Sequence, residues 1–302
     1  MPIHLASISR RTFLRSATSM ATAVLVLRDV RASQQADDSD FLAMLADTHV
    51  PSDRTISNDG ANMTENLELV IGELRALETK PAGIVIDGDC AFLKGLADDY
   101  KNLAQILGPL LDARLPVHLT MGNHDNRQRM YEQLQQQRPE KPVVEGKHVS
   151  VLELPRANWF LLDSLFETDV VTGELGETQL GWLRQTLDAH SDKPAIIMAH
   201  HNPEWQASGN VSGLRETTEL FQMLVERKHV KAYVFGHTHR WEIKEHQGIH
   251  LVNLPPAGYV FDKAHPTGWV AAHVRADGIT LQINTLDKSH KENARRVELA
   301  WR

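Results

Sequence analysis

Short apolar segments alternate along this chain with segments of helical periodicity, and this alternation restricts the possible folds more than any other feature of the sequence. Phe41–Ala46, Gly83–Ile86 and Val117–Met121 each have the composition of a buried strand. Between them, Thr64–Leu77 and Leu96–Leu111 carry apolar residues at helical spacing. Strands that alternate with helices in this way predict an α/β domain with a parallel or mixed sheet.

The alternation continues through the middle of the chain and then gives way to strands alone. Further strands are expected at 149–154, 159–162, 195–199 and 231–235, further helices at Thr178–Ala189 and Leu214–His229, and strand-like segments at 241–245, 249–254, 268–274 and 279–285. The late strands would extend the same core or form a second sheet. Because no repeat or low-complexity tract interrupts residues 41–302, we expect a single catalytic domain there.

The first 32 residues have the composition of an export signal. Arg10, Arg11 and Arg15 precede an uncharged apolar stretch, Ser16–Leu27, which is shorter than the roughly 20 residues that span a bilayer. Adjacent arginines followed by Phe-Leu resemble a twin-arginine signal. We therefore expect residues 1–32 to be a signal peptide read by the twin-arginine export machinery, 33–40 to be a polar linker, and the protein to be periplasmic. A non-functional signal would leave it in the cytoplasm.

The charge balance excludes one class of function and the cysteine count another. The chain has 32 Lys and Arg against 39 Asp and Glu, a net charge of −7, and removing the net +4 of residues 1–32 leaves −11. Such an acidic chain is a poor candidate for binding nucleic acid through a basic face. A single cysteine excludes an intrachain disulfide and a cysteine-based zinc site. The 16 histidines point instead to metal binding or acid–base chemistry.

Five polar motifs stand directly after five of the predicted strands. They are Asp47-Thr48-His49, Asp87-Gly88-Asp89, Gly122-Asn123-His124-Asp125, His200-His201 and Gly236-His237-Thr238-His239. Each alone is compatible with an ordinary turn. Together they predict one metal site, because the carboxyl ends of parallel strands meet at one edge of a sheet. Asp, Asn and His without thiolate suit Mn, Fe, Zn or Co.

In this order the five motifs resemble those of the calcineurin-like metallophosphoesterases, over roughly residues 41–255. The resemblance implies a four-layer αββα sandwich, two mixed β-sheets flanked by helices, and two divalent or mixed-valence metal ions. It assigns Asp47, His49, Asp89 and His239 to one metal and Asp89, Asn123, His200 and His237 to the other, with Asp89 bridging them. His124 would face the substrate phosphate, and Asp125 would orient His124 or balance its charge.

The reaction implied by the resemblance is hydrolysis of a small phosphoester by a metal-bridging hydroxide. Two metals about 3.5–4 Å apart stabilise the attacking and departing oxygens of such a displacement, while His124 hydrogen-bonds the phosphate or protonates the leaving group. His49 is present, and Phe92 stands where purple acid phosphatases carry a tyrosine. The pattern is more similar to class III cyclic nucleotide and glycerophosphodiester phosphodiesterases, so a phosphodiesterase is expected. A phosphomonoesterase on the same site (a broad phosphatase or nucleotidase) and an inactive scaffold remain alternatives.

Several other residues carry weaker expectations. Cys90 is expected to be a small buried hydrophobe rather than a nucleophile or ligand, and Leu162-Asp163-Ser164 to be a turn that ends a strand. Residues that could shape a substrate pocket are Asn202, Pro203, Glu204, Trp205, Tyr259, Phe261, His265 and Trp269. Metal identity, natural substrate, oligomeric state and the exact cleavage site stay open at this stage.

Overall fold

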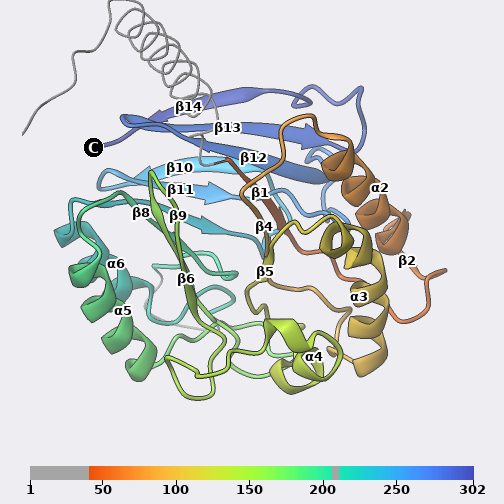
Figure 1. The fold of residues 1–302 in the computed structure, drawn as a ribbon, viewed down its shortest axis with the longest axis horizontal. Helices are drawn as coiled ribbons and strands as arrows, with labels where there is room; N and C mark the ends of the chain where they lie inside the picture. The colour runs from red at the N-terminus through yellow and green to blue at the C-terminus, as the bar shows by residue number, and fades with distance from the viewer. Residues whose placement is uncertain (1–40, 206–210) are drawn as a thin grey trace, which may run out of the picture. The chain divides into compact units, whose positions relative to one another are not determined.

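Two six-stranded mixed sheets face each other in the computed structural model, which describes residues 41–205 and 211–302 (Figure 1). The predicted signal peptide and linker, residues 1–40, lie outside the described residues. In spatial order, the first sheet consists of β14 (Arg296–Ala300), β13 (Gly278–Thr285), β12 (Gly268–Val274), β1 (Phe41–Ala46), β4 (Gly83–Asp87) and β5 (Val117–Leu119). Strands β1, β4 and β5 run parallel, and the three carboxy-terminal strands extend this sheet antiparallel.

The second sheet has parallel strands at its centre and an antiparallel strand at each edge. Its order is β10 (Glu242–His246), β11 (Ile249–Asn253), β9 (Val230–Phe235), β8 (Ala195–Met198), β7 (Asn158–Leu161) and β6 (Ser150–Glu153). Strands β7, β8, β9 and β11 are parallel neighbours. The carboxyl ends of β8 and β9 are therefore at the same edge of this sheet, as are those of β1, β4 and β5 in the first.

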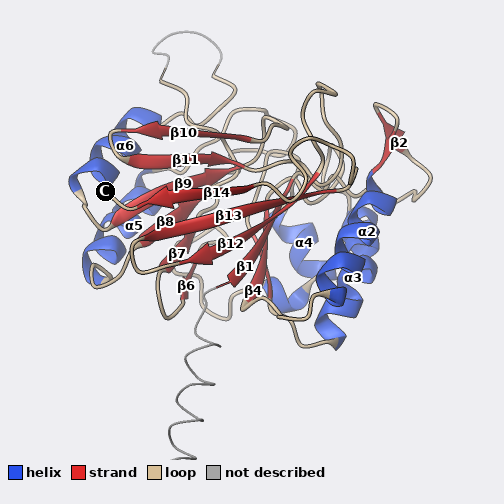
Figure 2. Ribbon diagram, turned by 90° about the horizontal axis from the view of Figure 1, so that it is seen from above, coloured by secondary structure: helices blue, strands red, loops and turns tan. Residues whose placement is uncertain are grey.

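Helices cover the outer face of each sheet (Figures 1 and 2). On the side of the first sheet are α2 (Met63–Ala76), α3 (Ala97–Asp112) and α4 (Arg127–Gln133), and on the side of the second are α5 (Glu177–Ala189) and α6 (Thr217–Glu226). The four layers confirm the predicted αββα sandwich. Within the described residues, no helix is long and apolar enough to cross a membrane.

The period-two alternation of strand residues explains how both faces of each sheet are buried. In β1, Leu42 and Met44 belong to the apolar cluster between the sheets, whereas Ala43 and Leu45 belong to the cluster under α2 and α3. Burying one such large apolar side chain stabilises the fold by about 1.5–3 kcal/mol. Strands covered on both faces are apolar throughout, which is why their sequence pattern was clear.

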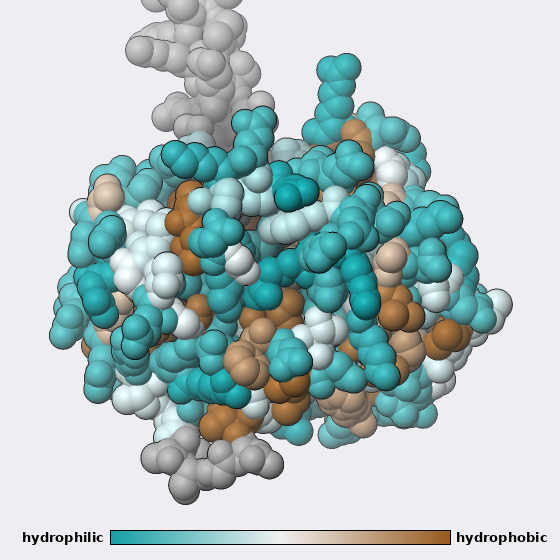
Figure 3. Space-filling view, turned by 90° about the horizontal axis from the view of Figure 1, so that it is seen from below, coloured by the Kyte–Doolittle hydropathy of each residue, from teal (hydrophilic) through white to brown (hydrophobic). Residues whose placement is uncertain are grey.

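The face of the molecule seen in Figure 3 is ordinary for a globular protein. Figure 3 shows the face that is lowest in Figure 1 as mainly hydrophilic, with apolar residues in small separate patches. Scattered exposure of this kind needs no special explanation.

The elements that the sequence pattern did not predict are short or lie at an edge. Helix α4 has seven residues and buries only Met130. Strand β14 is an edge strand with mostly exposed side chains. The strands β2 (Ser57–Asn58) and β3 (Ala61–Asn62) have two residues each and pair as a short hairpin. Helix α6 is shorter than expected, because Leu214 is held in isolated bridges with Pro203 and Gly173 before the helix begins.

Candidate metal centre

The loops after β1, β4, β5, β8 and β9 converge on one place between the carboxyl edges of the two sheets. Within the first sheet, the His49 amide donates to the Asp89 carbonyl at 2.9 Å. Across the sheets, the His237 amide donates to the Asp47 carboxylate at 3.1 Å, and His200 Nδ1 lies 2.8 Å from the Asp87 carbonyl. These cross-sheet hydrogen bonds hold the predicted site residues in one cluster.

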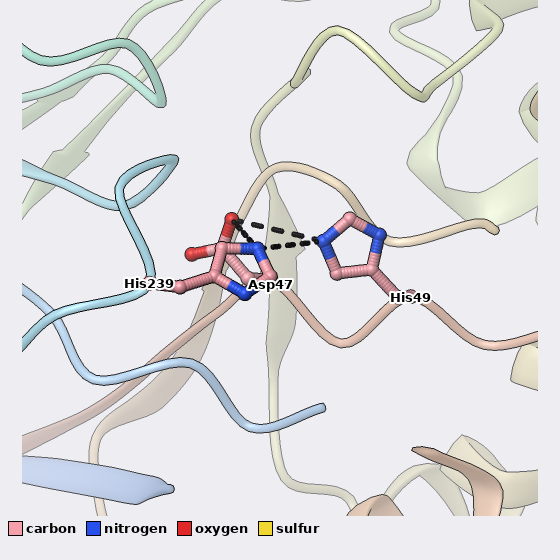
Figure 4. A group of neighbouring side chains, drawn as sticks. All are labelled: Asp47, His49 and His239. Atoms are coloured by element: carbon pink, nitrogen blue, oxygen red, sulfur yellow. Dashed lines mark hydrogen bonds and ion pairs between the residues drawn. The ribbon is translucent and has the colours of Figure 1, made fainter. Parts of the chain in front are cut away.

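Asp47, His49 and His239 form the first group of side chains that could hold a metal ion. Figure 4 shows the two imidazoles and the carboxylate pointing toward one another from two separate loops. The Nε2 atoms of His49 and His239 are 3.0 Å apart, and His239 Nε2 is 3.4 Å from Asp47 Oδ1. All three side chains are buried.

Asp89, His200 and His237 form the second such group, and Asp89 lies between the two. Its Oδ2 is 3.2 Å from His200 Nε2 and 3.7 Å from His49 Nε2. One carboxylate therefore faces histidines of both groups, which is the position that the bridging role predicted for Asp89 requires.

Hydrogen bonds to backbone carbonyls fix the tautomer of three histidines and direct the opposite ring nitrogen of each away from the carbonyl. His239 Nδ1 contacts the Tyr259 carbonyl at 2.7 Å, His200 Nδ1 the Asp87 carbonyl at 2.8 Å, and His237 Nε2 the Ser212 carbonyl at 2.9 Å. A carbonyl only accepts, so each of these nitrogens carries the proton. The opposite nitrogen keeps its lone pair, as in histidines that bind metals.

Asn123 and His124 occupy the rim between the two groups. The buried Oδ1 of Asn123 has no hydrogen-bond partner among the described residues, although such an atom is costly to leave unpaired. The His124 amide donates to Asp89 Oδ1 at 2.8 Å, and its Nδ1 lies 2.5 Å from the Leu93 carbonyl. His124 therefore presents Nε2 as its free nitrogen, and its ring lines the cleft.

The Asp125 carboxylate is not hydrogen-bonded to the His124 ring, which the sequence analysis expected it to orient or charge-balance, within the described residues. Its carboxylate is fully buried and accepts hydrogen bonds from the backbone amides of Cys90, Ala91 and Gly122 and from the Tyr100 hydroxyl. Through these hydrogen bonds Asp125 holds the loop after β4 and the loop after β5 together. Burial raises the pKa of Asp125 to about 6, and no hydrogen bond between the described residues links it to His124.

The electrostatics of the cluster favour a bound cation. Burial lowers the pKa of His200, but the charges of Asp89 and Asp47 outweigh this effect and raise it to about 10. For His49, burial dominates and lowers the pKa to about 3. Two buried carboxylates, Asp47 and Asp89, thus lie among the histidine rings, and a divalent ion would balance their negative charge. The donor set of carboxylate, amide oxygen and imidazole suits first-row metals.

Five of the seven predicted metal ligands have left-handed backbone conformations. The φ angles are 51° at Asp47, 45° at His49, 45° at Asp89, 67° at His237 and 54° at His239. Non-glycine residues rarely adopt this region, and each instance costs about 1–3 kcal/mol. Strain concentrated in these loops is typical of a functional site.

The comparisons with known proteins agree with this geometry. Residues 42–241 match the sequence profile of the calcineurin-like phosphoesterase family.

The chain belongs to this family.

Two relatives and one solved structure illustrate the similarity. The chain is 27% identical over 229 residues to a 3′,5′-cyclic-nucleotide phosphodiesterase of Nostoc sp., covering 75% of this chain and 81% of the relative. It is 25% identical over 221 residues to a glycerophosphodiester phosphodiesterase of Enterobacter lignolyticus, covering 71% and 76%. A dimetal phosphatase from Danio rerio superimposes with a TM-score of 0.67 at 14% identity, covering 87% of this chain and 99% of the other, which supports the fold.

Two glycines allow the close packing of this phosphoesterase site. A Cβ on Gly122 would lie 2.2 Å from Asp89 Oδ1, and one on Gly236 would lie 2.6 Å from Asp47 Oδ2. Neither carboxylate could keep its place beside a larger residue. The third and fifth motifs therefore begin with glycine because there is no room for a side chain at these two positions.

The phosphoesterase cleft contains only part of the predicted pocket residues. The cavity has a volume of about 420 Å³ and is lined by Asn202, Tyr259 and Phe261 next to the metal-binding candidates. Trp269 is instead buried and donates to Glu73, and His265 lines a separate hollow. Those two expectations were wrong.

Other weak expectations are confirmed. Cys90 is buried in the apolar cluster of the first sheet, and burial raises the pKa of its thiol well above the usual range. Asp163 lies two residues after the end of β7 and forms an ion pair with Arg127 at 2.5 Å. Ser164 Oγ lies 2.7 Å from Nδ1 of His201, which packs beside His237.

Sequence reasoning missed three residues that shape the site. Leu93 and Ser212 act through backbone carbonyls, so no side-chain pattern could reveal them. Arg240 lines the cleft directly after His239, and its position beside the fifth motif was the available signal.

Proposed function

We propose that this protein is a phosphodiesterase that uses two metal ions. The observation that carries the proposal is the position of Asp89, whose Oδ2 lies near Nε2 of both His49 and His200, one histidine from each group. The named relatives, a cyclic-nucleotide phosphodiesterase and a glycerophosphodiester phosphodiesterase, support a diester substrate.

The residues present fit two metal ions. Asp47, His49, Asp89 and His239 would hold one, and Asp89, Asn123, His200 and His237 the other. The fit rests on the unpaired Asn123 Oδ1 and His200 Nε2, both buried, and on the tautomers fixed by backbone carbonyls. When bound, the ions would supply a water-derived nucleophile near neutral pH and neutralise phosphate charge.

His124 is the protein group that would act on the substrate itself. The Leu93 carbonyl fixes its Nδ1, so Nε2 is the nitrogen available to a phosphate oxygen or to the leaving group. In its imidazolium form His124 would donate a hydrogen bond from Nε2–H to the phosphate and pass this proton to the departing alkoxide, which leaves His124 as the neutral imidazole with its proton on Nδ1. Asp89 holds the backbone of His124 in place through its Oδ1.

A comparison of two chromogenic substrates tests the proposal. Bis(p-nitrophenyl) phosphate and p-nitrophenyl phosphate are offered to protein loaded in turn with Mn²⁺, Co²⁺, Zn²⁺ and Fe²⁺, with His250→Ala as a matched control for a histidine outside the cleft. We expect faster diester hydrolysis and loss of activity on chelation. If the monoester is hydrolysed as fast as the diester or faster, the protein is a phosphomonoesterase and the proposed diesterase function is wrong. An unchanged rate after chelation would refute the metal mechanism.

We further propose that residues 1–32 direct export and are removed. The support is the arginine pair before the uncharged stretch in the sequence. Amino-terminal sequencing of periplasmic protein is expected to begin at Ser33, and material that begins at Met1 or Pro2 would contradict removal.

A further inference from the structure

A second hollow adjoins the metal cleft and shares a wall with it. Its volume is about 240 Å³, and Asn202, Thr238 and Arg240 line both cavities. Phe235, at the end of β9, and Leu251, within the neighbouring strand β11, provide apolar surface. A substrate whose phosphate lies at the metal cleft can therefore extend past Arg240 into this hollow.

The guanidinium of Arg240 has no partner in the part of the chain that the structure describes. The side chain is exposed and makes no hydrogen bond or ion pair there. By contrast, Lys244 in the same hollow is paired with Glu242 at 2.8 Å. Arg240 thus offers a planar set of five N–H donors to a ligand without first breaking an ion pair.

Trp205 supplies an aromatic surface in the same hollow. One face of its indole stacks on His246, with ring centroids 4.5 Å apart and an interplanar angle of 27°. The Phe221 ring also contacts the indole, with centroids 5.3 Å apart. Trp205 nevertheless remains 42% exposed and lines the hollow, so ring surface covered by neither neighbour is available to a ligand.

We propose that this hollow binds the nucleobase of a cyclic nucleotide, which stacks on Trp205 and accepts hydrogen bonds from Arg240. The inference rests on the proposed phosphodiesterase function and names its substrate class. A flat ring with nitrogen and oxygen acceptors uses both the indole and the guanidinium. A glycerophosphodiester with a cationic head group would be repelled by Arg240, and a second phosphate would leave Trp205 unused.

Binding of adenosine to metal-free protein tests the subsite directly. Adenosine carries the base without a phosphate, so calorimetric titration after chelation measures the subsite independently of the metals. We expect Trp205→Ala to weaken binding by about tenfold, as for loss of one base–aromatic stack. Trp205→Phe should restore most of the affinity, Arg240→Ala should also weaken binding, and Arg184→Ala, an exposed arginine on α5, should not.

The competing outcomes separate the subsite from the proposed function. Adenosine binding that depends on Trp205 in a protein without diesterase activity would support the subsite and refute the function. Hydrolysis of 3′,5′-cyclic AMP with an unchanged KM in Trp205→Ala and Arg240→Ala would support the proposed function and refute the subsite. Loss of adenosine binding in Phe261→Ala alone would place the base in the metal cleft and overturn the proposal. Absence of adenosine binding in the wild type would overturn it too.

Discussion

The Nε2 atoms of His49 and His239 lie 3.0 Å apart although 190 positions separate the two residues in the chain. His49 follows a strand of the first sheet and His239 a strand of the second, so this contact joins the two halves of the sandwich. Asp47 Oδ1 lies beside both buried imidazoles. The three side chains can therefore coordinate a single metal ion.

Removing either imidazole is expected to remove one metal ion. His239→Ala and His49→Ala each delete a ligand of the same candidate ion, and we expect elemental analysis to give about one metal per chain instead of two. Diesterase activity should fall by more than about 100-fold, since even indirect partners of metal ligands contribute 10–100-fold. His250→Ala is the control. Full metal content in both site variants would mean that the two histidines form only a hydrogen bond.

Neighbouring residues Asn123 and His124 are expected to behave differently when truncated. Asn123→Ala removes the unpaired buried oxygen and should lower metal content. His124→Ala should leave metal content near that of the wild type and lower kcat by about 10²–10⁴-fold, the usual contribution of general acid–base catalysis. Elemental analysis and steady-state kinetics on the same samples separate the two effects. Equal metal loss in both variants would contradict the role proposed for His124.

The layers of the fold could be predicted because their signal is local. Leu42 and Met44 face one side of β1 while Ala43 and Leu45 face the other, and both sides are covered, so the strand is apolar throughout. Helix α4 had no comparable signal, because it buries only Met130 and takes its place from neighbouring loops. An element with so little buried surface is set by tertiary contacts.

The site could be predicted as a list of residues but not as a network. Asp47, Asp89 and His239 stand out because each follows a strand. The role of Asp125 depends on the amides of Cys90 and Ala91, 35 and 34 positions away, and on the Tyr100 hydroxyl. Contacts at such separations leave no periodic pattern in the sequence.

The four hydrogen bonds that the Asp125 carboxylate accepts make this residue important for the stability of the fold. Tyr100→Phe removes the hydroxyl that donates to Asp125 at 2.9 Å and accepts from the Asn126 amide at 2.6 Å, and we expect a loss of about 1–3 kcal/mol in the free energy of unfolding. Asp125→Asn should cost about 3 kcal/mol, because it places an amide group among backbone N–H donors. Urea unfolding in the presence of chelator measures both, with exposed Asp192→Asn as the control.

A smaller loss in the free energy of unfolding for Asp125→Asn than for Tyr100→Phe would contradict the importance assigned to Asp125. The carboxylate has four donors, whereas the hydroxyl contributes two hydrogen bonds. The carboxylate must therefore be the more sensitive of the two positions.

His148 is expected to make stability depend on pH away from the metal centre. Burial lowers the pKa of His148 below its ordinary value of 6.5, despite the opposing charge of Asp163, and its Nδ1 lies 2.8 Å from the Tyr131 hydroxyl. The unfolded chain thus binds a proton at a higher pH than the folded chain does. The contribution of His148 to stability is full above pH 6.5 and is lost as the pH falls below that value.

Urea unfolding between pH 8 and pH 5 in the presence of chelator measures this contribution. His148→Asn cannot take up the proton, so its free energy of unfolding should fall less steeply below pH 6.5 than that of the wild type. The matched control is His250→Asn, at a half-buried histidine on β11 that is hydrogen-bonded to the Ala300 carbonyl, and it should follow the wild type. A wild-type slope in His148→Asn would show that the proton is taken up elsewhere. Among the described residues, the other histidines outside the site with lowered pKa values are the half-buried His118, His229 and His273.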